Sequence, residues 1–371
     1  MVKTMSKSHY IIPVFVPDLG CPHQCVFCNQ KMITGQVSCP TQEEVQLTIT
    51  DYLGTIPRET GIFKEVAFYG GSFTSVDPLL QKELLTPAYK ALKSGAIKGI
   101  RVSTRPDSIS EETLALLASY GVSIVELGVQ SMDDEVLCRS GRGHTSRDVL
   151  RAAALIKSWG IDLGFQMMIG LPGDTEEKDI FTASELISMK PDLVRIYPCL
   201  VLKNTRLADL HENGDYIPLN LEQAVVCCKR LLLMFENAGI NVIRIGLQPS
   251  EQINLQGDVL AGPYHPAFRE LVETAAARDQ VELLLKKAGV KSAKLIEIAV
   301  PEQDISITRG HKGSNIEYFS RNHGVTDFVT VTAPELPRGT LKLISVDGRE
   351  YGYTVSREDL LSGEWRVESG E

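Results

Sequence analysis

The hydrophobic pattern of the first 200 residues alternates between short apolar runs and longer amphipathic stretches. The short runs, which are typical of strands, cover residues 11–17, 65–69, 99–104, 123–129, 162–169 and 192–197. The stretches between them predict helices over residues 42–53, 79–94, 111–120, 146–159 and 176–189. Strands that alternate with helices indicate a parallel sheet joined by crossover helices.

Local signals support these boundaries and define the fold class. Ser110 and Thr175 each precede a pair of glutamates, as helix N-caps do. Gly95, Gly121 and Gly160 stand where helices are expected to end. Several strand runs lack a clean alternation, which favours strands buried on both faces. Because six strand–helix units are too few for a closed eight-fold barrel, we expect an α/β fold with a partial (β/α)6 TIM-like barrel over residues 1–247.

The remaining residues predict a second, smaller domain. A helix over 221–238 and a strand over 241–245 complete the barrel part, and residues 248–266 are rich in Gly and Pro. After this linker the pattern predicts helices over residues 267–288 and 315–322, and strands over residues 294–299, 304–308, 328–331, 340–344 and 351–354. Residues 248–371 are therefore expected to form a C-terminal α+β accessory domain.

The composition of the 371 residues narrows the class of protein. Hydrophobic residues make up 43% and charged residues 23%, which excludes a mostly disordered or collagen-like chain. The net charge of −9 offers no general attraction for nucleic acid or membranes. No apolar run reaches the length of a membrane span, and the polar residues 1–9 precede no export signal. We therefore expect a cytoplasmic protein without membrane contact.

Cysteine spacing points to a metal site. Cys21, Cys25 and Cys28 form a C-x3-C-x2-C pattern directly after the first predicted strand. This loop is expected at the carboxyl ends of the strands, where α/β sheets bind ligands. Thiolates suit an iron–sulfur cluster or zinc. Three thiolates can hold three corners of a [4Fe–4S] cubane and leave one iron open. A structural zinc would need a fourth ligand, such as Cys39 or His23.

These cysteines and five further segments resemble the radical S-adenosylmethionine (radical SAM) superfamily over about residues 10–245. Phe27 matches the family's usual aromatic residue before the last cysteine. The segment Phe68-Tyr-Gly-Gly-Ser-Phe-Thr74 resembles the glycine-rich edge that receives the amino group of SAM. The other segments are residues 102–107, 126–131, 168–173 and 195–201. Together they are most similar to the subgroup around the Elongator catalytic subunit and oxygen-independent coproporphyrinogen oxidase, and Thr104-Arg-Pro-Asp107 favours the Elongator branch.

The resemblance implies a radical SAM enzyme with two cofactors, SAM and one [4Fe–4S] cluster. Cys21, Cys25 and Cys28 would bind the cluster. The residues implied to contact SAM are Gly70, Gly71, Ser72, Thr74, Ser103, Arg105, Gln130, Met168 and Tyr197. Reductive cleavage of SAM would yield a 5′-deoxyadenosyl radical that abstracts a hydrogen atom. The resemblance also implies an electron donor of the flavodoxin or ferredoxin type, and it leaves the catalytic residues of the final reaction unassigned.

Two features depart from the Elongator pattern. The glutamate that usually precedes Thr-Arg-Pro-Asp is Ser103 here, so a carboxylate that could hold the SAM ribose is missing or comes from elsewhere. The segment Arg309-Gly-His-Lys-Gly313 lacks the R-x-x-G-x-G/A spacing of an acetyl-CoA pyrophosphate loop. We therefore expect no acetyltransferase domain.

Several assignments have a plain structural alternative. Arg105 and Gln130 either face SAM or form a salt bridge or loop hydrogen bond. Met168 fits a strand core as well as the adenine position. Cys199, at the end of the sixth predicted strand, is expected to pack in the core, and a hydrogen-atom donor is the alternative.

The final substrate stays open at this level. An RNA such as tRNA follows only from the Elongator-like segments, and the acidic net charge gives it weak support. A small molecule such as a porphyrin-like compound is the second candidate. Two further classes remain, namely a non-catalytic zinc-binding protein and an electron carrier that binds no SAM.

Overall fold

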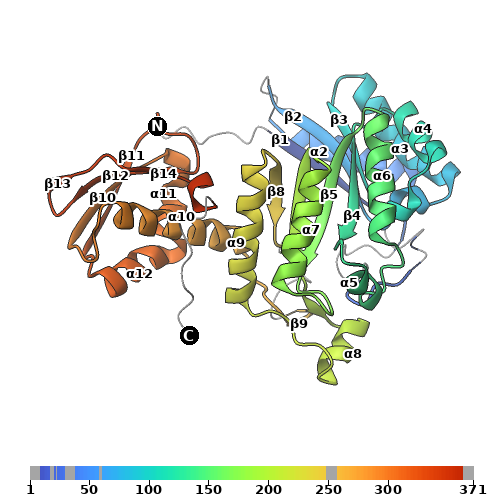
Figure 1. Ribbon diagram of the computed structural model, residues 1–371. Helices are drawn as coiled ribbons and strands as arrows, with labels where there is room; N and C mark the ends of the chain where they lie inside the picture. The colour runs from blue at the N-terminus through green and yellow to red at the C-terminus, as the bar shows by residue number, and fades with distance from the viewer. Residues whose placement is uncertain are drawn as a thin grey trace. The chain divides into compact units, whose positions relative to one another are not determined.

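The computed structural model describes residues 9–16, 21, 23–29, 38–57, 61–247 and 257–361 (Figure 1). Its contacts divide the chain into two compact units. The first comprises Met1–Leu219 and Leu247–Tyr264, and the second comprises Asn220–Gly246 and His265–Glu371. The contacts thus group residues 220–246 with the C-terminal unit, and the domain boundary expected after residue 247 stays a prediction.

A parallel sheet forms the centre of the first unit. Its strands are β1 (His9–Val16), β2 (Phe63–Gly70), β3 (Gly99–Thr104), β4 (Ile124–Gln130), β5 (Asp162–Ile169) and β6 (Leu193–Pro198). They pair in parallel and lie in sequence order, and β8 (Asn241–Ile245) takes the seventh position. This seven-stranded order confirms the expected partial TIM-like barrel.

Five helices connect consecutive strands of this sheet. They are α2 (Gln42–Thr55), α3 (Pro78–Lys93), α4 (Glu111–Ser119), α6 (Ser146–Ser158) and α7 (Glu176–Ser188), and Figure 1 shows them lying along the sheet. Each begins at a side-chain N-cap, supplied in turn by Thr41, Asp77, Ser110, Thr145 and Thr175. A cap oxygen accepts a backbone N–H that has no partner within the helix, so these residues decide where the helices start.

Short elements extend this unit beyond the strand ends. They are the 3₁₀ turns η1 (Phe73–Ser75) and η2 (Pro106–Ser108), helices α5 (Asp134–Arg139) and α8 (Arg206–Glu212), and the antiparallel pair β7 (Val201–Leu202) and β9 (Val259–Ala261). All of them follow the carboxyl ends of strands in the chain. Loops at that edge of a parallel sheet are where ligand sites form.

One face of the sheet carries charged residues although it is buried. Glu65, Arg101, Glu126 and Arg195 come from β2, β3, β4 and β6, and all are at most 6% exposed. Hydrogen bonds link all four side chains, so they share one face of the sheet. Buried charges persist only when they are paired, and here two carboxylates balance two guanidinium groups.

The second unit is an α+β fold, as expected. Its helices are α9 (Leu221–Asn237), α10 (Phe268–Lys287), α11 (Ile305–Arg309) and α12 (Ser314–His323). Its sheet contains β10 (Leu295–Val300), β11 (Asp327–Thr332), β12 (Thr340–Val346), β13 (Arg349–Glu350) and β14 (Thr354–Ser356). The order is β11-β10-β12-β13, with β14 beside β12. Across both units, none of the described helices has the length and apolar character of a membrane span.

The strand expected over residues 304–308 is wrong. Residues Glu302–Asp304 form a 3₁₀ turn and Ile305–Arg309 form helix α11. The alternating Ile-Ser-Ile-Thr sequence mimics a half-buried strand. The Asp304 carboxylate, however, accepts the Gly339 N–H at 2.6 Å, and the Asp304 carbonyl accepts the Thr308 hydroxyl at 2.8 Å. These bonds favour a helical turn over an extended chain.

Candidate active site at the strand ends

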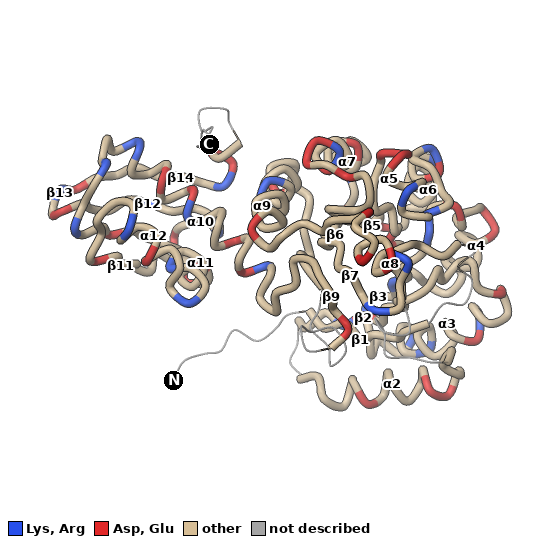
Figure 2. The backbone as a smooth tube through the Cα atoms, turned by 90° about the horizontal axis from the view of Figure 1, so that it is seen from below, with Lys and Arg blue, Asp and Glu red and all other residues tan. Residues whose placement is uncertain are grey.

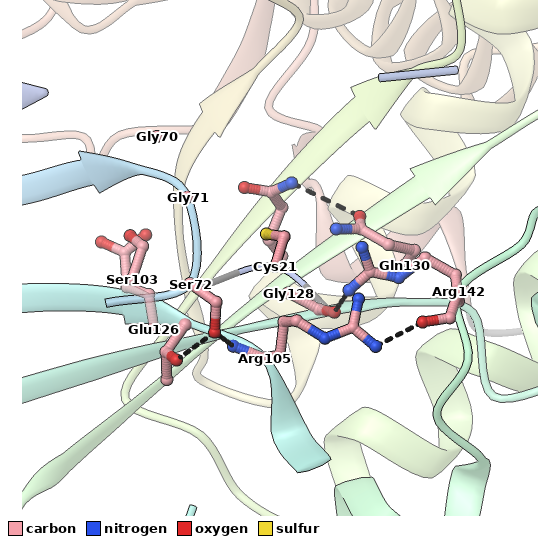
Figure 3. A pocket seen from close by; sticks show the side chains of 12 residues that line it. Cys21, Gly70, Gly71, Ser72, Ser103, Arg105, Glu126, Gly128, Gln130 and Arg142 are labelled. Atoms are coloured by element: carbon pink, nitrogen blue, oxygen red, sulfur yellow. Dashed lines mark hydrogen bonds between the residues drawn. The ribbon is translucent and has the colours of Figure 1, made fainter. Parts of the chain in front are cut away.

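A pocket opens at the carboxyl ends of the strands (Figure 3). It is lined by Cys21, Gly70, Gly71, Ser72, Ser103, Thr104, Arg105, Glu126, Gly128, Gln130, Arg142 and Gln166. Seven of these were expected from the sequence to bind the cluster or SAM, namely Cys21, Gly70, Gly71, Ser72, Ser103, Arg105 and Gln130. The sheet therefore brings together residues that are up to 109 positions apart. Their contacts with cofactors stay predictions.

The glycine-rich turn after β2 depends on the absence of a side chain at Gly70. Gly70 has a φ of +111°, and a Cβ built on it would lie 2.6 Å from the carbonyl oxygen of Val16. The N–H of Gly71 donates to the same oxygen at 2.7 Å. The turn therefore packs directly on the end of β1 and presents backbone to the pocket.

Replacement of Gly70 by alanine is expected to weaken SAM binding about tenfold, the equivalent of roughly 1.4 kcal/mol. The new Cβ must push the turn away from Val16 and adopt an unfavourable φ, which costs about 1–3 kcal/mol of stability. Isothermal titration with SAM and urea unfolding measure the two effects. Gly54→Ala in α2 is the control, because no atom of the described residues lies within 4 Å of its Cβ position. Equal SAM affinity in wild type and Gly70→Ala would contradict the expectation.

A cluster of hydroxyl groups supports the pocket wall below this turn. The Ser72 hydroxyl bonds that of Thr104 at 2.9 Å and accepts the Arg105 N–H at 3.3 Å. Thr74 bonds Thr104 at 2.6 Å and donates to the Ser108 carbonyl at 2.7 Å. Ser72 and Thr104 line the pocket, whereas Thr74 does not. Thr74 therefore ties η1 to the end of β3 and to η2, and its contact with SAM stays a prediction.

Two arginines on the pocket lining each carry a buried guanidinium N–H that has no partner among the described residues. Arg105 binds both carboxylate oxygens of Asp107, at 2.9 and 3.0 Å, and its Nη1 is the atom that no described residue bonds. Arg142 donates to the Cys25 Sγ at 3.2 Å and to the Gly128 carbonyl, and its Nε lacks a partner within the same described ranges. Figure 3 shows the two side chains next to each other. Unpaired guanidinium donors in a pocket favour an anionic ligand group such as a carboxylate.

Gln130 stands at an irregularity of β4. The register of β4 against β5 shifts between Gly128 and Gln130, and Gln130 has a φ of +70°. Its side-chain carbonyl accepts the amide of Gln166 at 3.4 Å. A non-glycine residue in the left-handed region is strained, and such strain is typical of functional sites. The bulge turns the Gln130 amide into the pocket.

A buried ionic network forms the floor beside this wall. Arg101 bonds Glu126 and also Glu65, the latter at 2.6 Å. The Arg195 Nε bonds Glu126 at 2.7 Å, and its Nη2 donates to the Tyr69 hydroxyl at 2.9 Å. Glu126 is the member that reaches the pocket. The network therefore fixes a carboxylate at the site.

Burial and charge set the protonation of this network. Burial opposes ionisation of Glu126, but Arg195 and Arg101 hold the pKa of Glu126 below its usual value. Burial raises the pKa of the Tyr69 phenol to about 12, so it stays protonated. In the parallel register Ser103 lies directly opposite Glu126. The carboxylate missing at Ser103 thus has a counterpart on the neighbouring strand.

Three further residues from the sequence analysis lie in a hydrophobic cluster outside the pocket lining. Met168 and Cys199 are buried there, and Tyr197 packs against them. Burial raises the pKa of the Cys199 thiol to about 12, although a hydrogen bond with Tyr216 opposes that rise. Cys199 therefore fits the core interpretation. The SAM contacts of Met168 and Tyr197 stay predictions.

The cysteine loop follows β1. Cys21 lies on the pocket wall, Cys25 is buried and Cys28 is half-buried. The N–H of Val26 donates to the Ser140 carbonyl at 3.0 Å. Among the residues that the structure describes, no three His, Cys, Asp or Glu side chains are gathered to hold a metal ion. The donor chemistry nevertheless fits a cluster with an open iron, because thiols are soft ligands and that of Cys21 belongs to a residue of the pocket wall.

Glu126, Arg142 and Gln166 are the chemically active lining residues that the sequence analysis missed as site residues. The sequence does contain an indication of Glu126 as a site residue. It is a charged residue inside an apolar strand run, and it lies within a segment that resembles the family. Arg142 stands between Gly141 and Gly143 on the connection from α5 to α6. That spacing indicates a tight turn but does not indicate what the arginine contacts.

Models of known protein families match most of the sequence that forms this site. The family described as the radical SAM superfamily matches residues 16–184, and the radical SAM C-terminal domain family matches residues 191–278. The chain belongs to the radical SAM superfamily. The predicted family is therefore confirmed, as is the predicted enzyme class, because the superfamily consists of enzymes. The alternative of a zinc-binding protein is correspondingly less supported.

The relatives of this radical SAM chain include Elongator proteins. A tRNA uridine(34) acetyltransferase of Methanocaldococcus infernus is 27% identical over 257 residues, covering 58% of this chain and 47% of the relative. Elongator complex protein 3 of Homo sapiens is 32% identical over 139 residues, which cover 37% of this chain and 25% of the relative. The solved structure of M. infernus Elp3 with an N-terminal deletion shares the fold, with a TM-score of 0.57 and 21% sequence identity. The match covers 76% of this chain and 64% of the solved chain. The chain spans about half the length of the archaeal acetyltransferase.

Proposed function

We propose that this chain reductively cleaves SAM at a [4Fe–4S] cluster, forms a 5′-deoxyadenosyl radical and acts on an RNA such as tRNA. The observation that carries the proposal is the pocket that joins Cys21 to the glycine turn and to two arginines, each with a guanidinium donor that no described residue bonds. Metal-ligand sulfur, exposed backbone and guanidinium groups are complementary to an amino acid bound at a metal. A structural zinc site would need no such pocket beside it.

The cysteine loop supplies the cluster ligands. Cys21, Cys25 and Cys28 would hold three irons, and the thiols lose their protons on binding because thiolate is the ligand. When bound and reduced, the cluster supplies one electron that splits the S–C5′ bond of SAM into methionine and the 5′-deoxyadenosyl radical. The protein's contribution is to bind and orient SAM and to exclude water from the pocket.

The pocket residues orient SAM through complementary polar groups. Backbone carbonyls of Gly70 and Gly71 would accept the ammonium group. The unpaired donors of Arg105 and Arg142 would bind the carboxylate. Glu126 would accept a ribose hydroxyl, because a carboxylate oxygen with one partner keeps a free lone pair. These roles use the donors and acceptors that the described residues leave open.

The relatives support RNA as the substrate class and the family supports a protein electron donor. The archaeal relative is named tRNA uridine(34) acetyltransferase, and its similarity extends over 257 residues. Figure 2 shows acidic and basic residues interspersed along the elements, so RNA recognition would depend on local contacts rather than on overall charge. A flavodoxin or ferredoxin would deliver the electron, since radical SAM enzymes require a reductant.

Anaerobic reconstitution with iron and sulfide tests the proposal directly. The brown protein, incubated with SAM and dithionite, is expected to release 5′-deoxyadenosine and methionine in equal amounts. Addition of deuterated tRNA should place deuterium in the 5′-deoxyadenosine, whereas a porphyrin-like compound should not. A protein that holds a complete cluster and binds SAM but releases no 5′-deoxyadenosine would refute the activity. Deuterium transfer from the porphyrin-like compound alone would refute the RNA substrate.

A further inference from the structure

Residues 140–144, here called the clamp segment, connect α5 to α6 and lie against the cysteine loop. The Ser140 carbonyl accepts the Val26 N–H at 3.0 Å. Gly141 has a φ of +67°, and a Cβ built on it would lie 3.1 Å from the Gln24 carbonyl oxygen. Gly143 has a φ of +74°. The backbone of the clamp segment thus follows the backbone of the cysteine loop at close range.

The side chain of Arg142 contacts Cys25, one of the proposed cluster ligands. Its Nη1 donates to the Sγ of Cys25 at 3.2 Å, and the arginine and the cysteine are 6% and 7% exposed. Its Nη2 donates to the Gly128 carbonyl, and its own carbonyl accepts Arg105. Outside the cysteine loop, the guanidinium group is therefore held by β4, and the backbone of Arg142 is held by the Arg105 side chain.

Two other basic side chains, those of His144 and Arg105, interact with Arg142. Burial lowers the pKa of His144 to about 3, with Arg142 and Arg105 adding to the effect, so its ring stays neutral. The Arg105 guanidinium is paired with the carboxylate of Asp107. The hydrogen bond to Cys25 is therefore a charge-assisted one, which is stronger than a neutral bond.

We propose that Arg142 is a positioning residue that donates a charge-assisted hydrogen bond to the cluster-bound Cys25 sulfur and thereby raises the reduction potential of the cluster. The inference rests on the proposed function, because it requires the cluster. Reduction adds one negative charge to the cluster and its ligands. A cationic donor at a ligand sulfur stabilises the reduced form more than the oxidised form, and hydrogen bonds to sulfur tune such potentials.

The test measures the midpoint potential of the cluster by electron paramagnetic resonance during a redox titration without SAM. Omission of SAM separates this role of Arg142 from any contact with the SAM carboxylate. Arg142→Gln keeps most of the side-chain length but removes the charge. We expect its midpoint to fall by about 59 mV or more, which corresponds to a tenfold change in a one-electron equilibrium. Arg142→Lys should shift the midpoint in the same direction by less.

Arg151→Gln is the matched control, because Arg151 is an exposed residue of α6 that pairs with Asp148. Its midpoint should equal that of the wild type. If Arg142→Gln does not assemble a cluster, Arg142→Lys decides, since lysine keeps the charge but lacks the planar fork whose Nη1 and Nη2 bond Cys25 and Gly128. An unchanged midpoint in the loaded Arg142 variants would overturn the inference. Failure of the wild type to form a cluster would instead overturn the proposed function.

Discussion

Replacement of Cys25 by serine is expected to remove the cluster and to lower 5′-deoxyadenosine release by more than 100-fold. Cys25 is buried and its sulfur already accepts a hydrogen bond from Arg142, so the loop places it toward the barrel. Loss of an outer-shell partner typically costs about 10–100-fold in metal affinity or activity, so loss of a ligand should exceed that range. Serine preserves the side-chain volume but supplies a hard oxygen in place of a soft thiolate.

Iron and sulfide content, visible absorption and 5′-deoxyadenosine release measure the effect of Cys25→Ser. Cys138→Ser is the matched control, because Cys138 is an exposed residue on the nearby helix α5. The control should keep the full iron content and rate. A Cys25→Ser protein with wild-type iron content and release rate would exclude Cys25 as a ligand. Loss of iron from Cys138→Ser would show that the cysteine assignment is incomplete.

Local sequence signals account for most of the fold of the first unit. The N-caps Ser110 and Thr175 begin α4 and α7 as expected, because a cap bonds backbone within three residues of itself. Sequence order also equals strand order in this sheet, so local elements alone were enough to indicate the barrel. The prediction of a strand over residues 304–308 was wrong, because the conformation there depends on Gly339, which is 35 positions from Asp304.

Part of the site was equally predictable and part was not. Gly70 and Gly71 were recognisable because they stand in a segment that resembles the family's glycine-rich edge, and Gly70 adopts a φ of +111° that favours glycine. Arg142 was not, since its contacts with Cys25 and Gly128 span 117 and 14 residues. Thr74 shows the reverse case, in which a residue inside a matching motif bonds Thr104 and Ser108 rather than lining the pocket. The spacing of a motif indicates which residues belong to it. Contacts between residues that are distant in the sequence decide which side chains line the pocket.

Replacement of Arg101 by methionine is expected to destabilise the protein by about 3–5 kcal/mol. Arg101 bridges Glu65 and Glu126, and the side chains of all three are at most 3% exposed. Its removal leaves two buried carboxylates with one guanidinium group, that of Arg195. Methionine fills much of the volume, so the loss reflects an unbalanced buried charge rather than a cavity. Urea unfolding of the full chain measures the change.

Two comparisons test whether charge is the cause of that loss. Arg321→Met removes an exposed arginine paired with Glu317 and should change stability by less than about 1 kcal/mol. Glu65→Gln in the Arg101→Met background removes the carboxylate that then keeps only His9, at 3.0 Å, and leaves Glu126 with Arg195. If charge balance governs the network, the double variant is more stable than Arg101→Met alone. A double variant that is less stable would mean that packing around Arg101, and not its charge, holds β2, β3 and β4 together.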